Sequence, residues 1–194
     1  MRTTRSRLML LAVGLVVAIA ATGCSSDDES PEQGESASTP SGSLCGSIPG
    51  EGPGSLGAMS TATAAEAIAQ SRLLTTLSSA SAGAEVTTTL EGEGPFTVFA
   101  PSNAAFGQIP AGELDSLLAD PEQVEELLGS HVIEGDEPLD VLLESGSVTS
   151  VSGERIQIDE VEGELTVNGA GIVCGPVEVA NGTIYIVDQV SLPT

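Results

Sequence analysis

The sequence has no tryptophan and no lysine, and it contains a single tyrosine and a single histidine. Five arginines stand against 28 aspartates and glutamates, which gives a formal net charge of −23. Such a charge repels phosphate groups. The composition therefore argues against binding to nucleic acid or to anionic lipid through a basic patch. It favours cations or basic proteins as partners, although a solvated acidic surface without a ligand explains the charge equally.

Recognisable catalytic and metal-binding motifs are also missing. The chain has no G-x-S-x-G, H-E-x-x-H or P-loop sequence, and His131 has no second histidine to share a metal. Catalysis would need a nucleophile, a base and an orienting group together. The densest acidic run, residues 159–164, offers oxygen atoms to Ca²⁺ but lacks the order of an EF-hand loop. We predict no enzyme activity, no cofactor and no metal site, and we expect His131 to stabilise the fold.

Aromatic residues are few, and all three phenylalanines lie between residues 96 and 106. The β-forming residues 96–99 are followed by Pro101, which cannot donate to a strand ladder. Ser102 or Asn103 can cap a new helical turn that Gly107 soon ends. The stretch predicts a strand, a corner and a short capped helix. Because the large rings are concentrated here, it also predicts the centre of the hydrophobic core.

These residues carry a family resemblance. FTVFAPSNAAF (residues 96–106) resembles the first signature of the fasciclin domain, and NGTIYIVDQVSLP (residues 181–193) resembles its closing signature. Residues 127–135 are similar to the central Tyr-His segment of the family, with Ser130 in place of the tyrosine. Cys45 and the Val173-Cys174-Gly175 segment make the resemblance closest to the mycobacterial single-fasciclin surface antigens, secreted or lipid-anchored.

The resemblance implies a fold and a set of motif positions. The implied fold is α+β, an antiparallel β-wedge covered by a layer of short helices, and the implied role is adhesion or recognition. The motif positions, expected to stabilise the fold or to contact a ligand, are Thr97, Phe99, Pro101, Ser102, Asn103, Phe106, His131, Asn181, Gly182 and Asp188.

Residues 1–23 are typical of a lipoprotein signal peptide. Three arginines precede the apolar residues 8–21, a run of 14 that is too short to cross a hydrocarbon core of about 30 Å. Ala21-Thr22-Gly23-Cys24 resembles the bacterial lipobox, in which the cysteine is acylated and becomes the first residue. We predict lipidation of Cys24, with ordinary secretory cleavage as the alternative. The mature chain then has two arginines against 28 acidic residues, a net charge of −26.

Residues 24–44 predict a disordered tether, because Ser, Pro and acidic residues bury too little surface to offset the entropy of ordering. The domain is expected to span residues 45–194. With Cys24 acylated, Cys45 and Cys174 remain, and an exported pair is expected to oxidise to a disulfide. A redox pair and a pair of metal ligands are the alternatives.

Helical and strand patterns divide the domain. Apolar residues recur at helical spacing between residues 61 and 90, and three further short helices are expected at residues 113–118, 121–128 and 139–144. Alternating residues from position 148 onward, with the turn signals Asn168-Gly169 and Asn181-Gly182, predict an antiparallel sheet.

We therefore expect a monomeric protein on the outer face of the cell membrane, attached by an N-terminal lipid or shed from it. One fasciclin domain would act in adhesion or recognition, by binding a protein or a glycan. A solute- or lipid-binding envelope lipoprotein and a structural envelope component are the alternatives. The first of these would need an apolar pocket between helices and wedge.

Overall fold

The computed structural model describes residues 39–161 and 163–191. Its helices are η1 (Cys45–Ser47), α1 (Leu56–Met59), α2 (Ala64–Gln70), α3 (Thr75–Ser81), α4 (Glu85–Leu90), α5 (Asn103–Phe106), α6 (Ala111–Leu118), α7 (Pro121–Gly129) and α8 (Leu139–Ser145). Its strands are β1 (Phe96–Pro101), β2 (Val132–Glu134), β3 (Ser147–Thr149), β4 (Arg155–Val161), β5 (Glu164–Val167), β6 (Ala170–Val179) and β7 (Gly182–Val187). The mixture of short helices and sheet confirms the expected α+β class.

The seven strands form one sheet in the order β2-β1-β7-β6-β5-β4-β3. Every pairing is antiparallel except β1 with β7, which runs parallel from Phe96 opposite Gly182 to Pro101 opposite Val187. The antiparallel pairing expected from residue 148 onward is confirmed from β3 to β7, whereas the β1–β7 pair departs from the antiparallel wedge that the resemblance implies. A parallel pair needs a long crossover connection, and the chain between β1 and β7 supplies it with four helices and five strands.

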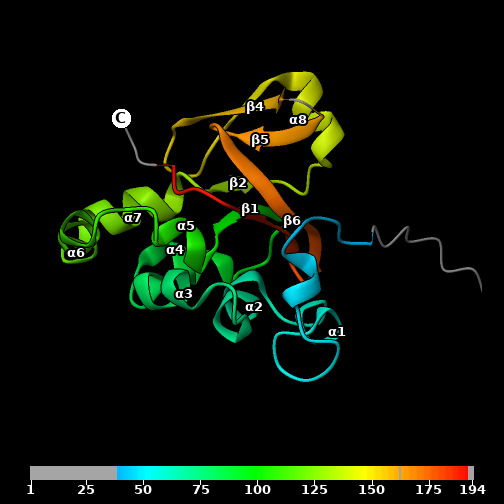
Figure 1. Cartoon of the computed structure of the whole chain (residues 1–194), viewed down its shortest axis with the longest axis horizontal. Coiled ribbons are helices and arrows are strands. Elements are labelled where there is room, and N and C mark those ends of the chain that lie inside the picture. Colours follow the sequence, from blue (N-terminus) through cyan, green and yellow to red (C-terminus); the bar gives the residue numbers. More distant parts are fainter. Residues whose placement is uncertain (1–38, 162, 192–194) are drawn as a thin grey trace, which may run out of the picture. The chain divides into compact units, whose positions relative to one another are not determined.

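Side chains are buried on both faces of β1, and two hydrophobic clusters meet there. The first contains Phe96, Val98 and Phe106 with residues of α2, α3, α4 and α7, and the second contains Phe99 with Tyr185 and residues of β4 and α8. Figure 1 shows α2 to α7 gathered on one side of the molecule and α8 with β4 and β5 on the other. The phenylalanines are at the core as predicted, but they are divided between its two parts.

Helix α7 begins as the sequence predicts. Asp120 accepts hydrogen bonds from the backbone N–H groups of Glu122 and Gln123, and Pro121 occupies the first turn. Gln123 donates to the Asp120 side chain at 2.7 Å and so does not complete the expected capping box. This side-chain bond, followed by the backbone bond from Gln123, lowers the pKa of Asp120.

Helix α6 covers the core less than expected. The apolar spacing of α6 predicts that Leu114, Leu117 and Leu118 face inward, but the side chain of Leu118 is 37% exposed and none of the residues of α6 is fully buried. Helix α6 packs beside α7 at the edge of the helical layer (Figure 1), and Leu118 is its last residue. Leu118 is therefore available to another molecule.

The two Asn-Gly turn signals occupy different positions in their hairpins. Asn168 and Gly169 both have positive φ, 51° and 80°, and form the two-residue turn between β5 and β6. Gly182 instead belongs to β7 and pairs with Val179, so Ala180 and Asn181 form that turn. Gly182 has φ 146°, and a Cβ there would collide with the carbonyl oxygen of Phe96.

The folded part begins before the expected boundary at Cys45. Ser41 and Gly175 exchange two backbone hydrogen bonds, and Leu44 donates to Val173. A disulfide joins Cys45 to Cys174 across 129 residues, with the Cα atoms 5.0 Å apart. Strand β6 thus holds residues 41–45 along its edge. Cys24, the leader and most of the expected tether lie outside the described residues, in which no helix has the length and apolar character to cross a bilayer.

Candidate functional site

The motif residues of β1 and α5 form hydrogen bonds within the fold. Thr97 donates from Oγ1 to the carbonyl oxygen of Gly135 at 2.8 Å. Ser102 caps α5 by accepting from the N–H of Ala105. Asn103 accepts from the N–H of Thr76 at 2.9 Å and from the Thr75 hydroxyl, and it donates to the carbonyl oxygen of Arg72. These side chains join the strand to neighbouring loops and to α3.

Asn181 connects three segments that are far apart in the sequence. Its Oδ1 accepts from the N–H of Ala64 at 2.7 Å, and its Nδ2 donates to the carbonyl oxygens of Leu90 and Gly92, each at 2.8 Å. The start of α2 and the end of α4 are thereby held to the β6–β7 turn. Because Nδ2 is already engaged, the formal N-glycosylation sequence Asn181-Gly182-Thr183 is better explained by the fold.

Asp188 has a similar structural position just after β7. Its Oδ1 accepts from the N–H of Gly171 at 2.7 Å, and its backbone N–H donates to the carbonyl oxygen of the same residue. Gln108 then donates from Nε2 to the carbonyl oxygen of Asp188 at 2.7 Å. The closing segment is thus attached to β6 and to the residues that follow α5.

His131 is buried, and both of its ring nitrogens have partners. Nδ1 lies 2.6 Å from the carbonyl oxygen of Leu127 and Nε2 lies 3.3 Å from the N–H of Ser191, so Nδ1 carries the proton and Nε2 accepts. Burial lowers the pKa of His131, and the bond to Leu127 opposes this shift only in part.

Ser130 lies beside this ring, but the pair is not arranged for catalysis. The Ser130 hydroxyl is 3.2 Å from Nδ1 of His131 and donates to the carbonyl oxygen of Leu127 at 2.8 Å. A protonated Nδ1 cannot remove a proton from the serine. Both side chains are buried beneath α7, away from solvent.

The cavity next to His131 is too small for a ligand. Its volume is about 20 Å³, and apolar side chains such as Ile68, Leu77, Val98 and Leu128 surround it. One water molecule would fill it, whereas a lipid chain would not fit. This cavity therefore does not supply the apolar pocket between helices and wedge that the lipid-binding alternative needs.

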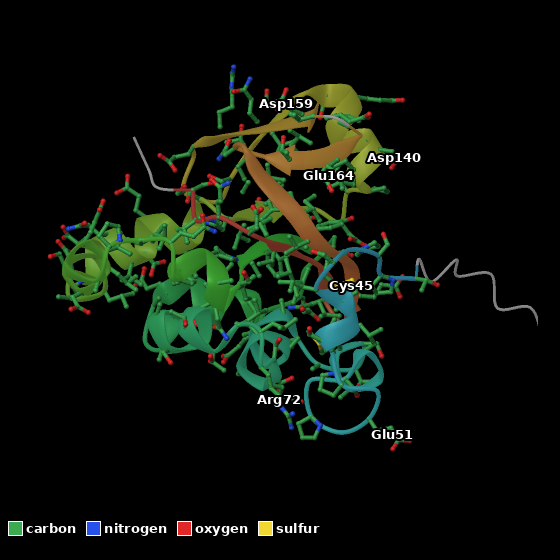
Figure 2. The ribbon with its side chains drawn as sticks, in the orientation of Figure 1. Cys45, Glu51, Arg72, Asp140, Asp159 and Glu164 are labelled. Atoms are coloured by element: carbon green, nitrogen blue, oxygen red, sulfur yellow. A yellow bond between two sulfur atoms is a disulfide. The ribbon has the colours of Figure 1, made fainter. Side chains whose placement is uncertain are left out.

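Two further features of the sequence carry no site. Asp159 and Glu164 project from the β4–β5 pair, on the side of the sheet away from Arg72 (Figure 2), and the described residues contain no cluster of three or more metal-ligating side chains. Gly52, Gly54 and Gly57 have the G-x-G-x-x-G spacing of dinucleotide-binding loops. However, Gly57 lies within α1, which has only four residues, and no strand among the described residues leads into the three glycines.

A hollow of about 480 Å³ lies over Tyr185, between β7 and the start of α8. Burial, reinforced by Asp136 and Asp140, raises the pKa of Tyr185 to about 12, so the phenol is neutral at physiological pH. Asp136 accepts a hydrogen bond from the Thr183 hydroxyl at 2.7 Å. The carboxylate of Asp136 is therefore already engaged in a hydrogen bond within the fold.

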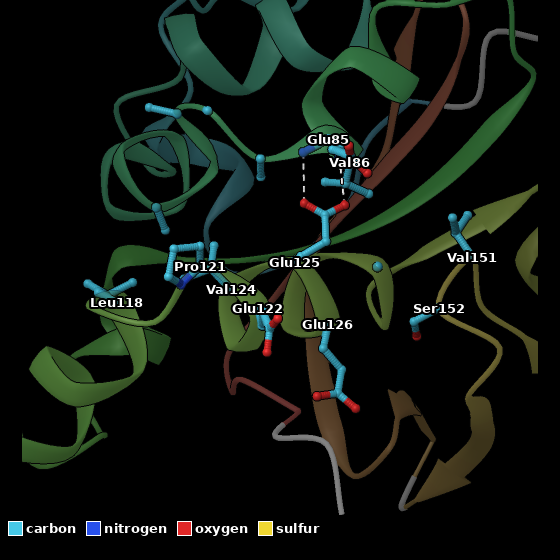
Figure 3. Close-up of a pocket in the computed structure, with 15 residues that line it drawn as sticks. Glu85, Val86, Leu118, Pro121, Glu122, Val124, Glu125, Glu126, Val151 and Ser152 are labelled. Atoms are coloured by element: carbon cyan, nitrogen blue, oxygen red, sulfur yellow. Dashed lines mark hydrogen bonds between the residues drawn. The ribbon is translucent and has the colours of Figure 1, made fainter.

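A groove of about 800 Å³ runs along α7 (Figure 3). We call it the α7 groove. One wall consists of small residues, namely Ala80 near the end of α3 and Ala82, Gly83 and Ala84 in the loop before α4. Leu118 and Pro121 lie at one end, and Val151 and Ser152 lie at the other. Leu118 and Val151 are two of the five large hydrophobic side chains that the described residues expose.

Four glutamates line the α7 groove: Glu85, Glu122, Glu125 and Glu126. Glu125 accepts from the N–H groups of Glu85 and Val86 at 2.7 and 2.9 Å, and so caps the start of α4 (Figure 3). The other three are exposed, and no hydrogen bond to their carboxylates occurs within the described residues. Neither Arg72 nor Arg155 lines the groove.

The sequence did not indicate this groove, because its walls come from segments about 40 residues apart. A local signal existed in the small residues 80–84, which leave a helix surface uncovered. Nothing in the sequence placed those residues opposite the glutamates of α7.

The sequence model of the fasciclin domain family matches residues 72–193, which are more than half of the chain. The chain belongs to the fasciclin family. Its fasciclin domain superposes on the solved FAS1 domain pair from the insect cell adhesion molecule Fasciclin I with a TM-score of 0.57 at 17% identity. That match covers 70% of this chain and 52% of the other, and it supports the fold alone.

Bacterial relatives share more of the sequence. The cell surface glycolipoprotein MPB83 of Mycobacterium bovis is 37% identical over 147 residues, which cover 73% of this chain and 66% of the relative. The immunogenic protein MPB70 of the same species is 34% identical over 148 residues, which cover 73% and 75%. Protein sll1483 of Synechocystis is 39% identical over 134 residues, which cover 68% and 73%. The resemblance to mycobacterial single-fasciclin antigens is thus confirmed.

Proposed function

We propose that this protein is a surface lipoprotein, held to the outer face of the cell membrane by acylated Cys24, whose fasciclin domain binds a protein at the cell surface. The lipobox-like sequence before Cys24 and the similarity to MPB83, a cell surface glycolipoprotein, support the location. Residues 24–40 would act as the tether, and their reach of roughly 20–25 Å would separate the domain from the membrane.

The observation that carries the binding role is the α7 groove. The motif residues are occupied by bonds within the fold, whereas the groove is open and exposes Leu118, Val151 and three carboxylates. Open surfaces that combine apolar side chains with a polar rim are typical of protein interaction sites. A role in binding, without chemistry, also agrees with the neutral, enclosed environment of His131.

The lipid anchor can be tested by detergent phase partitioning of the exported full-length chain. We expect the wild type in the detergent phase and Cys24→Ala in the aqueous phase, since each buried CH₂ contributes about 0.8 kcal/mol to membrane binding. Aqueous partitioning of the wild type would contradict the anchor.

The recognition role can be tested by attachment of whole cells to immobilised envelope and matrix proteins. Cells that display the full-length chain should attach more strongly than deletion cells, and the Cys24→Ala form, released from the surface, should not restore attachment. Equal attachment of deletion and wild-type cells, together with altered wall integrity, would instead favour a structural envelope component.

A further inference from the structure

We propose that the α7 groove binds a basic amphipathic polypeptide segment of a partner protein. Aliphatic side chains of that segment would contact the small residues at the end of α3 and in the loop before α4, and its lysines or arginines would lie against Glu85, Glu122 and Glu126. This inference rests on the proposed binding function and names the class of partner.

The shape of the groove fits side chains of a polypeptide. Its volume of about 800 Å³ is within the usual range of binding sites. Ala80, Ala82, Gly83 and Ala84 leave room where larger residues would fill the wall. Leu118, 37% exposed, and Val151, 39% exposed, provide apolar contacts at its two ends. Because these two side chains lie at opposite ends of the groove (Figure 3), it suits an elongated ligand with several apolar side chains.

The walls of the groove are fixed in position before binding. The carboxylate of Glu125 on α7 joins the first turn of α4 through two hydrogen bonds, and the N–H of Ser152 donates to the carbonyl oxygen of Gly129 at the end of α7. A groove that is already formed loses little conformational freedom when a ligand binds. The partner can therefore be a flexible segment that orders on the groove.

The charge of the groove selects the partner. Three exposed carboxylates surround it, none of its lining residues is an arginine, and the mature chain has a net charge of −26. Anionic ligands are repelled, and a neutral lipid would desolvate carboxylates without pairing them. The lining also contains no aromatic ring on which a sugar could stack. The positive charges of a cationic segment pair with the carboxylates, and its apolar side chains contact the wall of small residues.

Fluorescence anisotropy can test this with full-length protein carrying Cys24→Ala and a fluorescein-labelled peptide that places lysine and leucine at helical spacing. We expect the peptide to bind. Glu122→Gln combined with Glu126→Gln should weaken binding about tenfold, since each exposed ion pair contributes modestly. The matched control, Glu144→Gln with Glu160→Gln, removes two exposed charges from α8 and β4, outside the groove, and should leave binding within about twofold of the wild type.

Two further probes separate this site from general charge attraction. A peptide with serine in place of leucine should bind much more weakly, and photoreactive leucines in the original peptide should crosslink to residues 80–84, 118–129 or 151–152. Equal weakening by both double variants, equal binding of the serine peptide, or crosslinks elsewhere would overturn the inference. Binding of a fluorescent fatty acid in preference to the peptide would do the same and assign the groove to lipid.

The outcome of the peptide experiment is distinguishable from the outcome of the cell-attachment experiment that tests the proposed function. If cells lose attachment on deletion but Glu122→Gln with Glu126→Gln attaches normally, the binding role stands and the assignment of the groove fails. If the groove binds the peptide as expected but deletion leaves attachment unchanged, the adhesive role fails.

Discussion

Nε2 of His131 accepts a hydrogen bond from the backbone N–H of Ser191, 60 residues later, at 3.3 Å. The ring therefore joins the end of α7 to the segment that follows β7, and this bond exists only while Nε2 lacks a proton. The side chains around the adjacent cavity are all uncharged, so nothing near the ring compensates a positive charge.

The first prediction is that stability decreases as the pH falls below the ordinary histidine pKa of about 6.5. Because burial lowers the pKa of His131 in the folded state, the unfolded chain binds more protons in this range, and acidification favours unfolding. Thermal melts of the wild type from about pH 7 to pH 5 should show a falling melting temperature.

The control for this prediction is His131→Asn, which keeps an amide N–H near the carbonyl oxygen of Leu127. We expect this variant to be less stable at neutral pH but to have a flatter profile over the same pH range. Carboxylates protonate at lower pH and relieve repulsion, which changes stability in the opposite direction. Identical slopes for the two proteins would show that His131 is not the titrating group.

The second prediction concerns Asn181. Asn181→Ala removes an acceptor from the start of α2 and a donor from the carbonyl oxygens of Leu90 and Gly92. We expect a loss of about 2–4 kcal/mol in the free energy of unfolding, because partly buried backbone groups lose their partners. Urea unfolding measures this loss. Gln108→Ala, which removes one exposed hydrogen bond to Asp188, should cost less than about 0.5 kcal/mol.

Local signals in the sequence predicted a large part of the fold. Pro101 ends β1, Ser102 caps α5, Asp120 caps α7 and Gly146 ends α8 in the left-handed conformation, each by an interaction within four residues. Such short-range chemistry can be inferred from the identities of neighbouring residues alone. The family resemblance then supplied the arrangement of these elements.

Long-range relationships were not predictable in the same way. The parallel pairing of β1 with β7 depends on two segments more than 80 residues apart, and the α7 groove depends on α4 facing α7. Leu118 has the spacing of an inward-facing residue, yet its side chain is exposed because the rest of the described chain leaves it partly uncovered. Sequence periodicity identifies an apolar face but not whether the chain or a partner covers that face.

The third prediction concerns the disulfide. Replacing Cys45 and Cys174 together by alanine opens a loop of 129 residues, and the chain-entropy model gives an upper limit of roughly 5 kcal/mol for the stability lost. We expect a loss of about 2–5 kcal/mol. The backbone amide hydrogens of Ser41 and Leu44, which bond to carbonyl oxygens of β6, should also exchange with solvent faster in the variant. Alkylation of the unreduced wild type at both cysteines would contradict the bridge.

The last prediction follows from the net charge of −23 of the full sequence. Like charges repel within a compact fold, and salt screens this repulsion over a Debye length that falls from about 30 Å at 0.01 M to about 10 Å at 0.1 M. Added NaCl should therefore raise the melting temperature, mostly below about 0.2 M. The same salt should weaken binding of the lysine-leucine peptide, because screening also reduces the attraction between its charges and the carboxylates of the α7 groove. A flat melting temperature across the titration would show that the acidic side chains are already well separated in solvent.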